Sequence, residues 1–228
     1  MSSNQHQHPV NPINPVVVVI FLVILGIELV FTLGNQGFIG GPEAVGWRVE
    51  AINDYGFSGT AFHWMLDNNQ WPPAFLMRFV TYMFVSGNFT QMIVAGVMLL
   101  ALGKFVGEVF SGWAVVVVFL GSGIGGALIW GLLLDDPTFV IGAFPGVYGL
   151  IGGFTYILWL RLGESGDNQY RAFAMIGFLM LIQLFFGIIY GARTDWLVDL
   201  GGFVSGFLLS FVVSPGGWKR LRAKLRHE

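Results

Sequence analysis

Long apolar stretches with almost no charge are the feature that most limits what this chain can fold into. A helix needs about 20 mostly apolar residues to cross the hydrocarbon layer of a bilayer. Six stretches of that kind occur, at residues 15–33, 79–102, 113–134, 141–160, 173–190 and 196–213. Because backbone groups in lipid must be hydrogen-bonded within the chain, such segments form helices. We therefore predict an all-α membrane protein built as a bundle of six transmembrane helices.

The composition excludes a water-soluble globular protein. Hydrophobic residues make up 55% of the chain and charged residues only 11%, against about 25% charged residues in soluble domains. Cysteine is absent, which excludes disulfides, thiolate metal sites and cysteine nucleophiles. Much of the protein surface must therefore face lipid rather than water.

The chain divides into three parts. Residues 1–14 form a polar tail that we expect to be disordered, residues 15–214 hold the transmembrane bundle, and residues 215–228 form a basic tail. Only the first connection, residues 34–75, is long, and its tryptophans favour a structure at the level of the lipid headgroups. His6 and His8 in the first tail have no third ligand nearby, so we predict no metal site.

The cations are divided unequally between the two ends of the predicted helices. With six spans both termini lie on one side, and that side receives eight cations: Lys104, Arg161, Arg171 and the five that follow Trp218. The other side receives three: Arg48, Arg78 and Arg193. The positive-inside rule then predicts cytoplasmic termini and a long extracytoplasmic first loop, in a bacterial inner membrane. The basic tail is expected to lie on anionic lipid.

Glycine clusters mark three of the predicted helices. The patterns GSGIGG, GVYGLIGG and GGFVSG occur in the third, fourth and sixth helices. Small residues four apart allow membrane helices to approach closely, because packing drives their association in lipid. We expect the fourth and sixth helices to touch, with Gly149 and Gly153 facing Gly202 and Gly206.

Glu28 is an acid within the first predicted helix. A carboxylate inside a membrane span faces protein or water, and is a candidate for a functional contact. Two interpretations remain open for this residue. The side chain either contacts a partner helix or reaches the nearby outer interface.

Three segments resemble the rhomboid family of intramembrane proteases. RFVTYMF with SGNFTQMIVAGVMLLALGK resembles the second rhomboid helix, GAFPGVYGLIGG the start of the fourth, and DWLVDLGGFVSGFLL the sixth. The pair Trp47 and Arg48 is similar to a Trp-Arg motif in the family's first loop. The resemblance covers residues 47–213, and it implies a rhomboid-like bundle.

The resemblance also assigns the catalytic positions, and none of them carries the family's residue. Phe144 stands at the position of the nucleophilic serine, Asp199 at that of the histidine base, and Gln91 and Ala95 at those of the oxyanion donors. A phenyl ring is no nucleophile and alanine has no donor, so the dyad chemistry is not reproduced. We predict a pseudoprotease with no cofactor rather than an enzyme.

Tyr148 matches a family tyrosine that packs against the base. We hypothesise that Asp199 is buried and hydrogen-bonded to Tyr148 or Gln91, because an unpaired charge in the membrane is unfavourable. The alternative is an Asp199 in contact with water near the outer surface, since Trp196 marks that end of the helix.

The resemblance implies a non-catalytic protein that binds transmembrane helices of other membrane proteins, as an assembly, chaperone or quality-control factor. One alternative is an accessory structural subunit of a larger membrane complex. A second alternative is an active rhomboid serine protease. The expected partners are the lipid bilayer and other transmembrane helices, with no role for nucleic acid.

Overall fold

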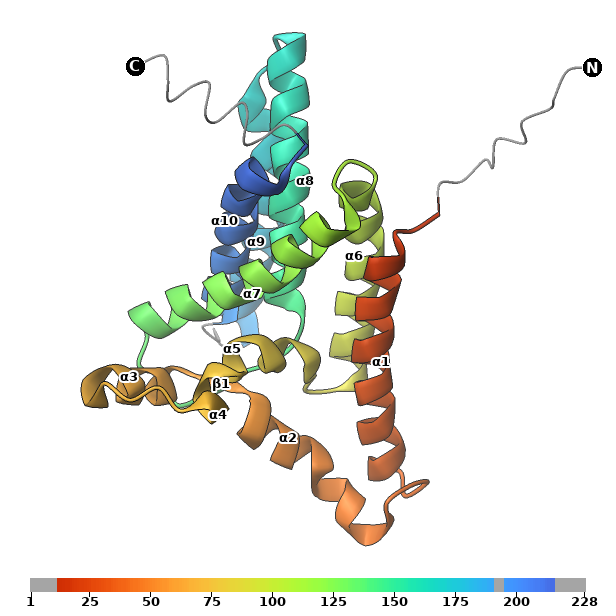
Figure 1. The fold of residues 1–228 in the computed structure, drawn as a ribbon, viewed down its shortest axis with the longest axis vertical. Helices are drawn as coiled ribbons and strands as arrows, with labels where there is room; N and C mark the ends of the chain where they lie inside the picture. The colour runs from red at the N-terminus through yellow and green to blue at the C-terminus, as the bar shows by residue number, and fades with distance from the viewer. Residues whose placement is uncertain (1–11, 191–194, 216–228) are drawn as a thin grey trace, which may run out of the picture.

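Six long helices form an elongated bundle in the computed structural model, which describes residues 12–190 and 195–215 without the side chains of residues 183–190. They are α1 (Pro15–Asn35), α6 (Phe89–Gly107), α7 (Gly112–Leu133), α8 (Phe144–Ser165), α9 (Ala174–Tyr190) and α10 (Asp195–Val213). α1 begins and α10 ends at the same end of the bundle (Figure 1). The predicted all-α membrane architecture is confirmed. The predicted tails fall mainly on residues 1–11 and 216–228, outside the described residues.

Within the described residues, four helices are long and apolar enough to cross a membrane: α1, α6, α7 and α10. α8 has 22 residues, but its glycines, tyrosines and Arg161 make it less apolar. α9 has 17 residues. The count of six spans therefore stays a prediction.

The centre of the bundle is the group formed by α7, α8 and α10, which make the most extensive contacts with one another. Every α8 residue from 145 to 153 is buried. A helix enclosed by its neighbours meets little lipid, so it tolerates the polar and small residues that lower its hydropathy. α1 packs against α6 on the other side of the bundle.

The long first connection is ordered as short elements at the end of the bundle opposite the start of α1 (Figure 1). They are η1 (Gly41–Gly46), α2 (Trp47–Tyr55), β1 (Phe57–Ser58), α3 (Gly59–Asn68), α4 (Pro73–Leu76), α5 (Arg78–Thr81) and η2 (Tyr82–Phe84). β1 pairs antiparallel with β2 (Phe139–Val140), which lies just before α8. This pairing ties the connection to the segment that leads into α8.

The second predicted span begins later than residue 79. Residues 79–84 form short helical turns, in which Tyr82 and Met83 are fully buried rather than exposed to lipid. Asn88 then has an extended conformation (φ −162°), and its side chain accepts a hydrogen bond from the Gln91 N–H at 2.8 Å. Such an N-cap starts a new helix. Likewise, the fourth predicted span begins at Phe144 and not at residue 141, since β2 precedes it.

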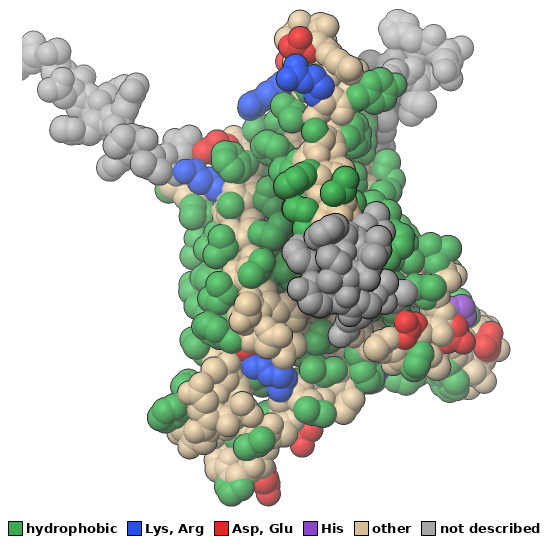
Figure 2. Space-filling model, turned by 180° about the vertical axis from the view of Figure 1, so that it is seen from behind, with side chains coloured by type: hydrophobic (Ala, Val, Ile, Leu, Met, Phe, Trp, Pro, Cys, Tyr) green, Lys and Arg blue, Asp and Glu red, His purple; other side chains and the backbone are tan. Residues whose placement is uncertain are grey.

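Hydrophobic side chains cover the middle of the molecule, and charged side chains gather toward its two ends (Figure 2). Large apolar residues on the outer faces are widely exposed, among them Leu22 of α1 (55%), Val97 of α6 (60%) and Leu181 of α9 (64%). This distribution is typical of a protein whose middle is surrounded by lipid.

Candidate functional site

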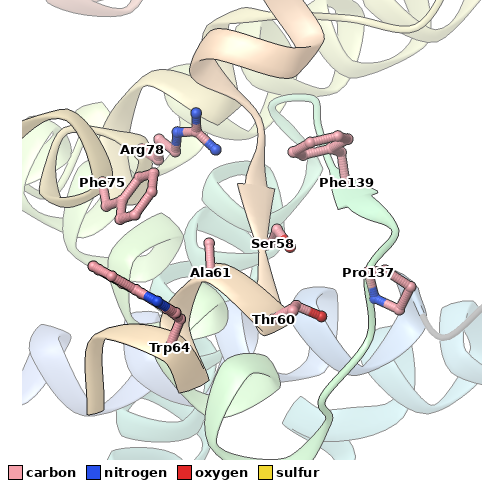
Figure 3. A pocket seen from close by; sticks show the side chains of 8 residues that line it. All are labelled: Ser58, Thr60, Ala61, Trp64, Phe75, Arg78, Pro137 and Phe139. Atoms are coloured by element: carbon pink, nitrogen blue, oxygen red, sulfur yellow. The ribbon is translucent and has the colours of Figure 1, made fainter. Parts of the chain in front are cut away.

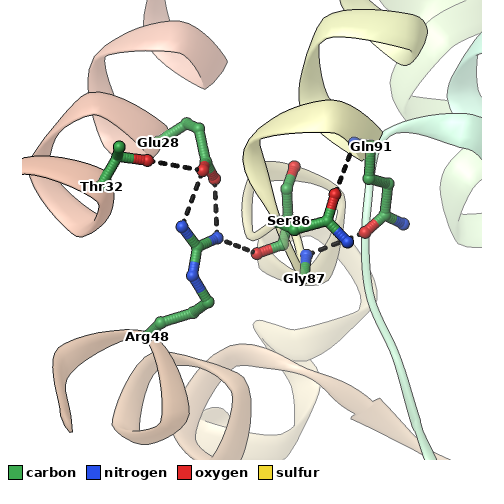
Figure 4. A network of polar contacts seen from close by, with 7 residues as sticks. Glu28, Thr32, Arg48, Ser86, Gly87 and Gln91 are labelled. Atoms are coloured by element: carbon green, nitrogen blue, oxygen red, sulfur yellow. Dashed lines mark hydrogen bonds and ion pairs between the residues drawn. The ribbon is translucent and has the colours of Figure 1, made fainter. Parts of the chain in front are cut away.

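Gln91, in the first turn of α6, joins the start of α6 to the segment before α8. Its side-chain oxygen accepts a hydrogen bond from the Gly87 N–H at 2.8 Å (Figure 4). Its amide nitrogen donates to the Ile141 carbonyl at 3.4 Å. Gly142 has a φ of +104°, and a Cβ there would lie 2.7 Å from the Gln91 amide nitrogen. Gln91 therefore binds one backbone group just before α6 and another just before α8.

Ala95 lies one turn further along α6. It is 2% exposed and belongs to the main hydrophobic core. Its methyl group has no hydrogen-bonding capacity, so it contributes packing only.

Phe144 and Pro145 form the first turn of α8. Proline fits there because the first N–H groups of a helix have no intrahelical partner. Pro145 is in close contact with α10, where a Cβ on Gly202 would overlap the Pro145 carbonyl carbon at 2.9 Å. The start of α8 is thus held directly against the backbone of α10.

Asp199, in the second turn of α10, is buried, with 6% of its surface exposed. Its carboxylate acts electrostatically on the hydroxyl groups of Tyr148 and Tyr82, so both rings lie near it. The Tyr82 hydroxyl donates to the Gly123 carbonyl at 2.9 Å. The structure therefore brings Asp199 and Tyr148 together, whereas the hydrogen bonds of the Gln91 side chain go to Gly87 and Ile141.

Apolar side chains surround Tyr148. It forms a small buried cluster with Ile151 of α8, Ile176 of α9 and Phe203 of α10, and Phe144 packs against this cluster. We call these five residues the α8 cluster. These residues come from three helices, and Met98 of a fourth helix, α6, packs against them. The side chains here offer aromatic and aliphatic surface rather than a nucleophile.

The buried hydroxyls of the bundle are mostly occupied. Ser210 donates to the Gly206 carbonyl at 2.7 Å, and Tyr156 and Ser214 share a hydrogen bond of 3.1 Å. Ser122 and Thr155 have no hydrogen-bond partner among the described residues. His63 is the only histidine in residues 12–190 and 195–215, and it lies in α3 of the first connection.

Glu28 forms a buried ion pair with Arg48. Both guanidinium NH groups donate to the carboxylate, at 2.7 and 2.8 Å, and Glu28 is only 1% exposed. Thr32 donates to the same carboxylate at 3.0 Å, and Arg48 also donates to the Ser86 carbonyl at 2.7 Å (Figure 4). Of the two interpretations of Glu28, the structure supports a protein contact, but the partner lies within the chain.

Trp47 packs where α1 ends. A Cβ added to Gly34 would lie 3.1 Å from its ring, and one added to Gly40 would overlap the ring. Trp47 and Arg48 thus connect α1 to the first connection, one by packing and the other by charge.

The glycines of α8 and α10 meet in a register that differs from the predicted one. Gly206 lies directly against the backbone of Gly149, and Gly202 lies against Pro145. A Cβ on Gly149 would meet Ser122 of α7, and one on Gly153 would lie 3.4 Å from the Ser210 hydroxyl. Gly152 faces the backbone of Phe203 and Phe207. It was not among the glycines predicted to lie at this contact.

A pocket of about 480 Å³ in the first connection was not predicted from the sequence. We call it the Arg78 pocket; its lining includes Ala61, Trp64, Phe75, Arg78, Pro137 and Phe139 (Figure 3). The one feature of the sequence that could have indicated this pocket is Arg78, a cation among aromatic residues.

Comparison with known proteins assigns the family. Residues 73–216, more than half of the chain, match the Rhomboid domain. RHOMBOID-like protein 1 of Arabidopsis thaliana is 30% identical over 124 residues, which are 49% of this chain and 31% of that protein. RHOMBOID-like protein 4 of the same plant is 26% identical over 136 residues, which are 60% of this chain and 34% of that protein.

The matched region contains α4 to α10 and therefore Gln91, Ala95, Phe144, Tyr148 and Asp199. Trp47 and Arg48 lie outside it, because it begins at residue 73 and not at residue 47. The chain spans about a third of the length of the two Arabidopsis relatives. With an all-α membrane bundle and a Rhomboid domain over most of its length, this chain belongs to the rhomboid family.

Proposed function

We propose that this chain is a non-catalytic rhomboid that binds transmembrane helices of other membrane proteins. The observation that carries the proposal is the α8 cluster. Hydrolysis needs a nucleophile, a base and water at one point, whereas Phe144 and Tyr148 pack there with aliphatic side chains from neighbouring helices. A site filled in this way favours packing over bond cleavage.

The proposed partner surface is the exposed side of α6 and α9. Ile93 and Val97 of α6 and Phe178 and Leu181 of α9 are each between 38% and 64% exposed. In lipid, such faces associate with other helices by packing. We further propose that Asp199 hydrogen-bonds to Tyr148 and holds α10 against α8. This contact would fix the α8 cluster, against which α6 and α9 pack.

A cleavage assay tests the loss of catalysis. Purified protein in proteoliposomes is mixed with a fluorescent transmembrane substrate, with Asp199→Asn as the matched variant and an active rhomboid as the positive control. We expect no cleavage above background from either form. Cleavage by the wild type that Asp199→Asn abolishes would show an active protease and overturn the proposal.

Site-specific photocrosslinking in native membranes tests helix binding. A photoreactive residue replaces Val97 of α6, and a matched one replaces Leu22 of α1, which is similarly exposed. We expect discrete protein adducts from position 97 and only lipid adducts from position 22. Identical patterns from both positions would contradict a specific surface, and one stoichiometric companion in mild detergent would favour the accessory-subunit alternative.

We also propose that both termini are cytoplasmic, in a bacterial inner membrane. In the structure, Lys104 lies in the last turn of α6 at the end where α1 begins, while Arg48 and Arg78 belong to the elements at the opposite end. The absence of cysteine makes single-cysteine labelling clean. Exposed Glu43→Cys should react with an impermeant maleimide in intact cells, and exposed Asp167→Cys only after permeabilisation. The reverse pattern would invert the topology.

A further inference from the structure

Among the residues that the structure describes, Arg78 is a cation without a counter-ion. It forms no hydrogen bond or ion pair with any residue that the structure describes, and its Nε atom is buried without a partner. Its guanidinium instead lies over the ring of Phe75, 5.0 Å from the ring centre. A guanidinium is always charged and has five N–H donors, so a half-buried one without an anion has unused binding capacity.

Asp135 and Asp136 come just before Pro137 of the pocket lining, and both accept hydrogen bonds from other residues. Asp135 accepts a hydrogen bond from Thr60 at 3.0 Å, and Asp136 accepts one from the Thr138 N–H at 2.8 Å. Burial lowers the pKa of the Arg78 guanidinium below its usual value, and the carboxylate of Asp54 acts in the opposite direction. Asp54 is therefore near enough to act electrostatically, but it forms no ion pair with Arg78.

The lining of the Arg78 pocket is amphipathic. The guanidinium provides charge, and Trp64, Phe75, Pro137 and Phe139 provide aromatic and aliphatic walls (Figure 3). The volume of about 480 Å³ is within the range of about 300–1,000 Å³ found for small-ligand sites. A ligand that matches this lining has an anionic group attached to an apolar body.

The pocket lies where lipid headgroups are expected. Pro137 and Phe139 follow closely on Leu133, the last residue of the apolar helix α7. Trp64 is 42% exposed at the rim, and tryptophan is enriched at the boundary between lipid and water. A guanidinium at this level can reach a lipid phosphate, with which it forms charge-assisted hydrogen bonds.

We propose that the Arg78 pocket binds a phospholipid, with the guanidinium on the lipid phosphate and the aromatic walls against the upper part of an acyl chain. The site is independent of the proposed function, because it contains none of the residues of the α8 cluster. It supplies Arg78 with the anion that no residue in the described part of the chain provides. A bound lipid would also cover the apolar walls, which otherwise face water at the headgroup level.

Native mass spectrometry of the detergent-purified protein tests this proposal with three probes. Phosphatidylglycerol carries phosphate and acyl chains, dioleoylglycerol carries the chains alone, and inorganic phosphate carries the anion alone. We expect phosphatidylglycerol to bind about tenfold more tightly than dioleoylglycerol, because hydrogen bonds to charged groups contribute that much. Arg78→Gln should remove the difference, while Arg171→Gln, a change of the same charge at an exposed position, should retain it.

A second variant covers the case in which Arg78→Gln fails to fold. Ala61→Leu keeps Arg78 and fills the pocket, so it should weaken phosphatidylglycerol binding to the level of dioleoylglycerol. Equal binding of the two lipids by the wild type, or full retention of phosphatidylglycerol in both pocket variants, would overturn the proposal. Tight binding of inorganic phosphate without retention of the lipid would overturn it too, by showing a site for a small soluble anion.

Discussion

Two arginines in the first connection lie at the same end of the bundle and have opposite surroundings. Arg48 makes two hydrogen bonds to Glu28 and a third to the Ser86 carbonyl. Arg78 has an aromatic ring, a buried Nε atom without a partner and an adjoining pocket. The charge of Arg48 thus holds two parts of the chain together, while that of Arg78 is left for a ligand.

Removing Arg48 should have the largest effect on stability. Arg48→Met leaves the carboxylate of Glu28 buried without its partner, and breaking a buried ion pair reduces the free energy of unfolding by about 3 kcal/mol or more. SDS titration in mixed micelles measures this loss. The double variant Glu28→Gln/Arg48→Met should lose less than the sum of its single variants. Strict additivity would mean that the two side chains do not interact.

Gln91→Ala should have the next largest effect. It removes the acceptor of the Gly87 N–H and the donor to the Ile141 carbonyl, so we expect a loss of about 1–2 kcal/mol. Arg48 binds Ser86, and Gln91 binds the next residue, Gly87, as well as Ile141 before α8. This variant therefore tests how the contacts of Arg48 continue toward the start of α8. Gln91→Glu, which keeps only the acceptor, should fall between Gln91→Ala and the wild type in the same titration.

Thr32→Val should produce a smaller loss, about 1 kcal/mol, because it removes one hydrogen bond to Glu28 while the ion pair remains. In the Arg48→Met background the loss should increase, since Thr32 is then one of few donors left to the carboxylate. An unchanged loss in that background would indicate that the two donors act independently.

Arg78→Met should change stability least in lipid-free detergent, by less than about 1 kcal/mol. Losing the contact with Phe75 is unfavourable, but the change also removes the buried Nε atom that lacks a partner. Added phosphatidylglycerol should stabilise the wild type and not this variant, because a ligand stabilises only the state that binds it. A large loss without lipid would show that Arg78 has the same structural role as Arg48.

The sequence predicted the long helices better than the contacts between them. The apolar run of α1 and the glycine-rich run of α7 are visible because length and hydropathy are local properties. The start of α6 was placed too early, because residues 79–84 are as apolar as a span and only the polar break at 86–88 separates them. Asn88, a residue type that often caps the start of a helix, was the feature of the sequence that indicated the true start of α6.

Contacts across the first connection depend on three-dimensional placement. Glu28 and Arg48 are 20 residues apart, and Arg48 and Ser86 are 38 apart, so no periodic pattern links them. The Arg78 pocket draws its walls from α3, α4, α5 and the segment before α8. The proximity of Asp199 to Tyr148 was suggested by the family resemblance, which supplied the relative placement of α8 and α10.

The pairing of β1 with β2 has a mechanical consequence. Phe57 and Ser58 are joined to Val140 and Phe139, and the Gly142 N–H donates to the Tyr82 carbonyl at 2.9 Å. The first connection and the segment that leads into α8 are thus held together at two points. We expect a displacement of α3, which follows β1 directly, to reach Phe144 through these backbone hydrogen bonds.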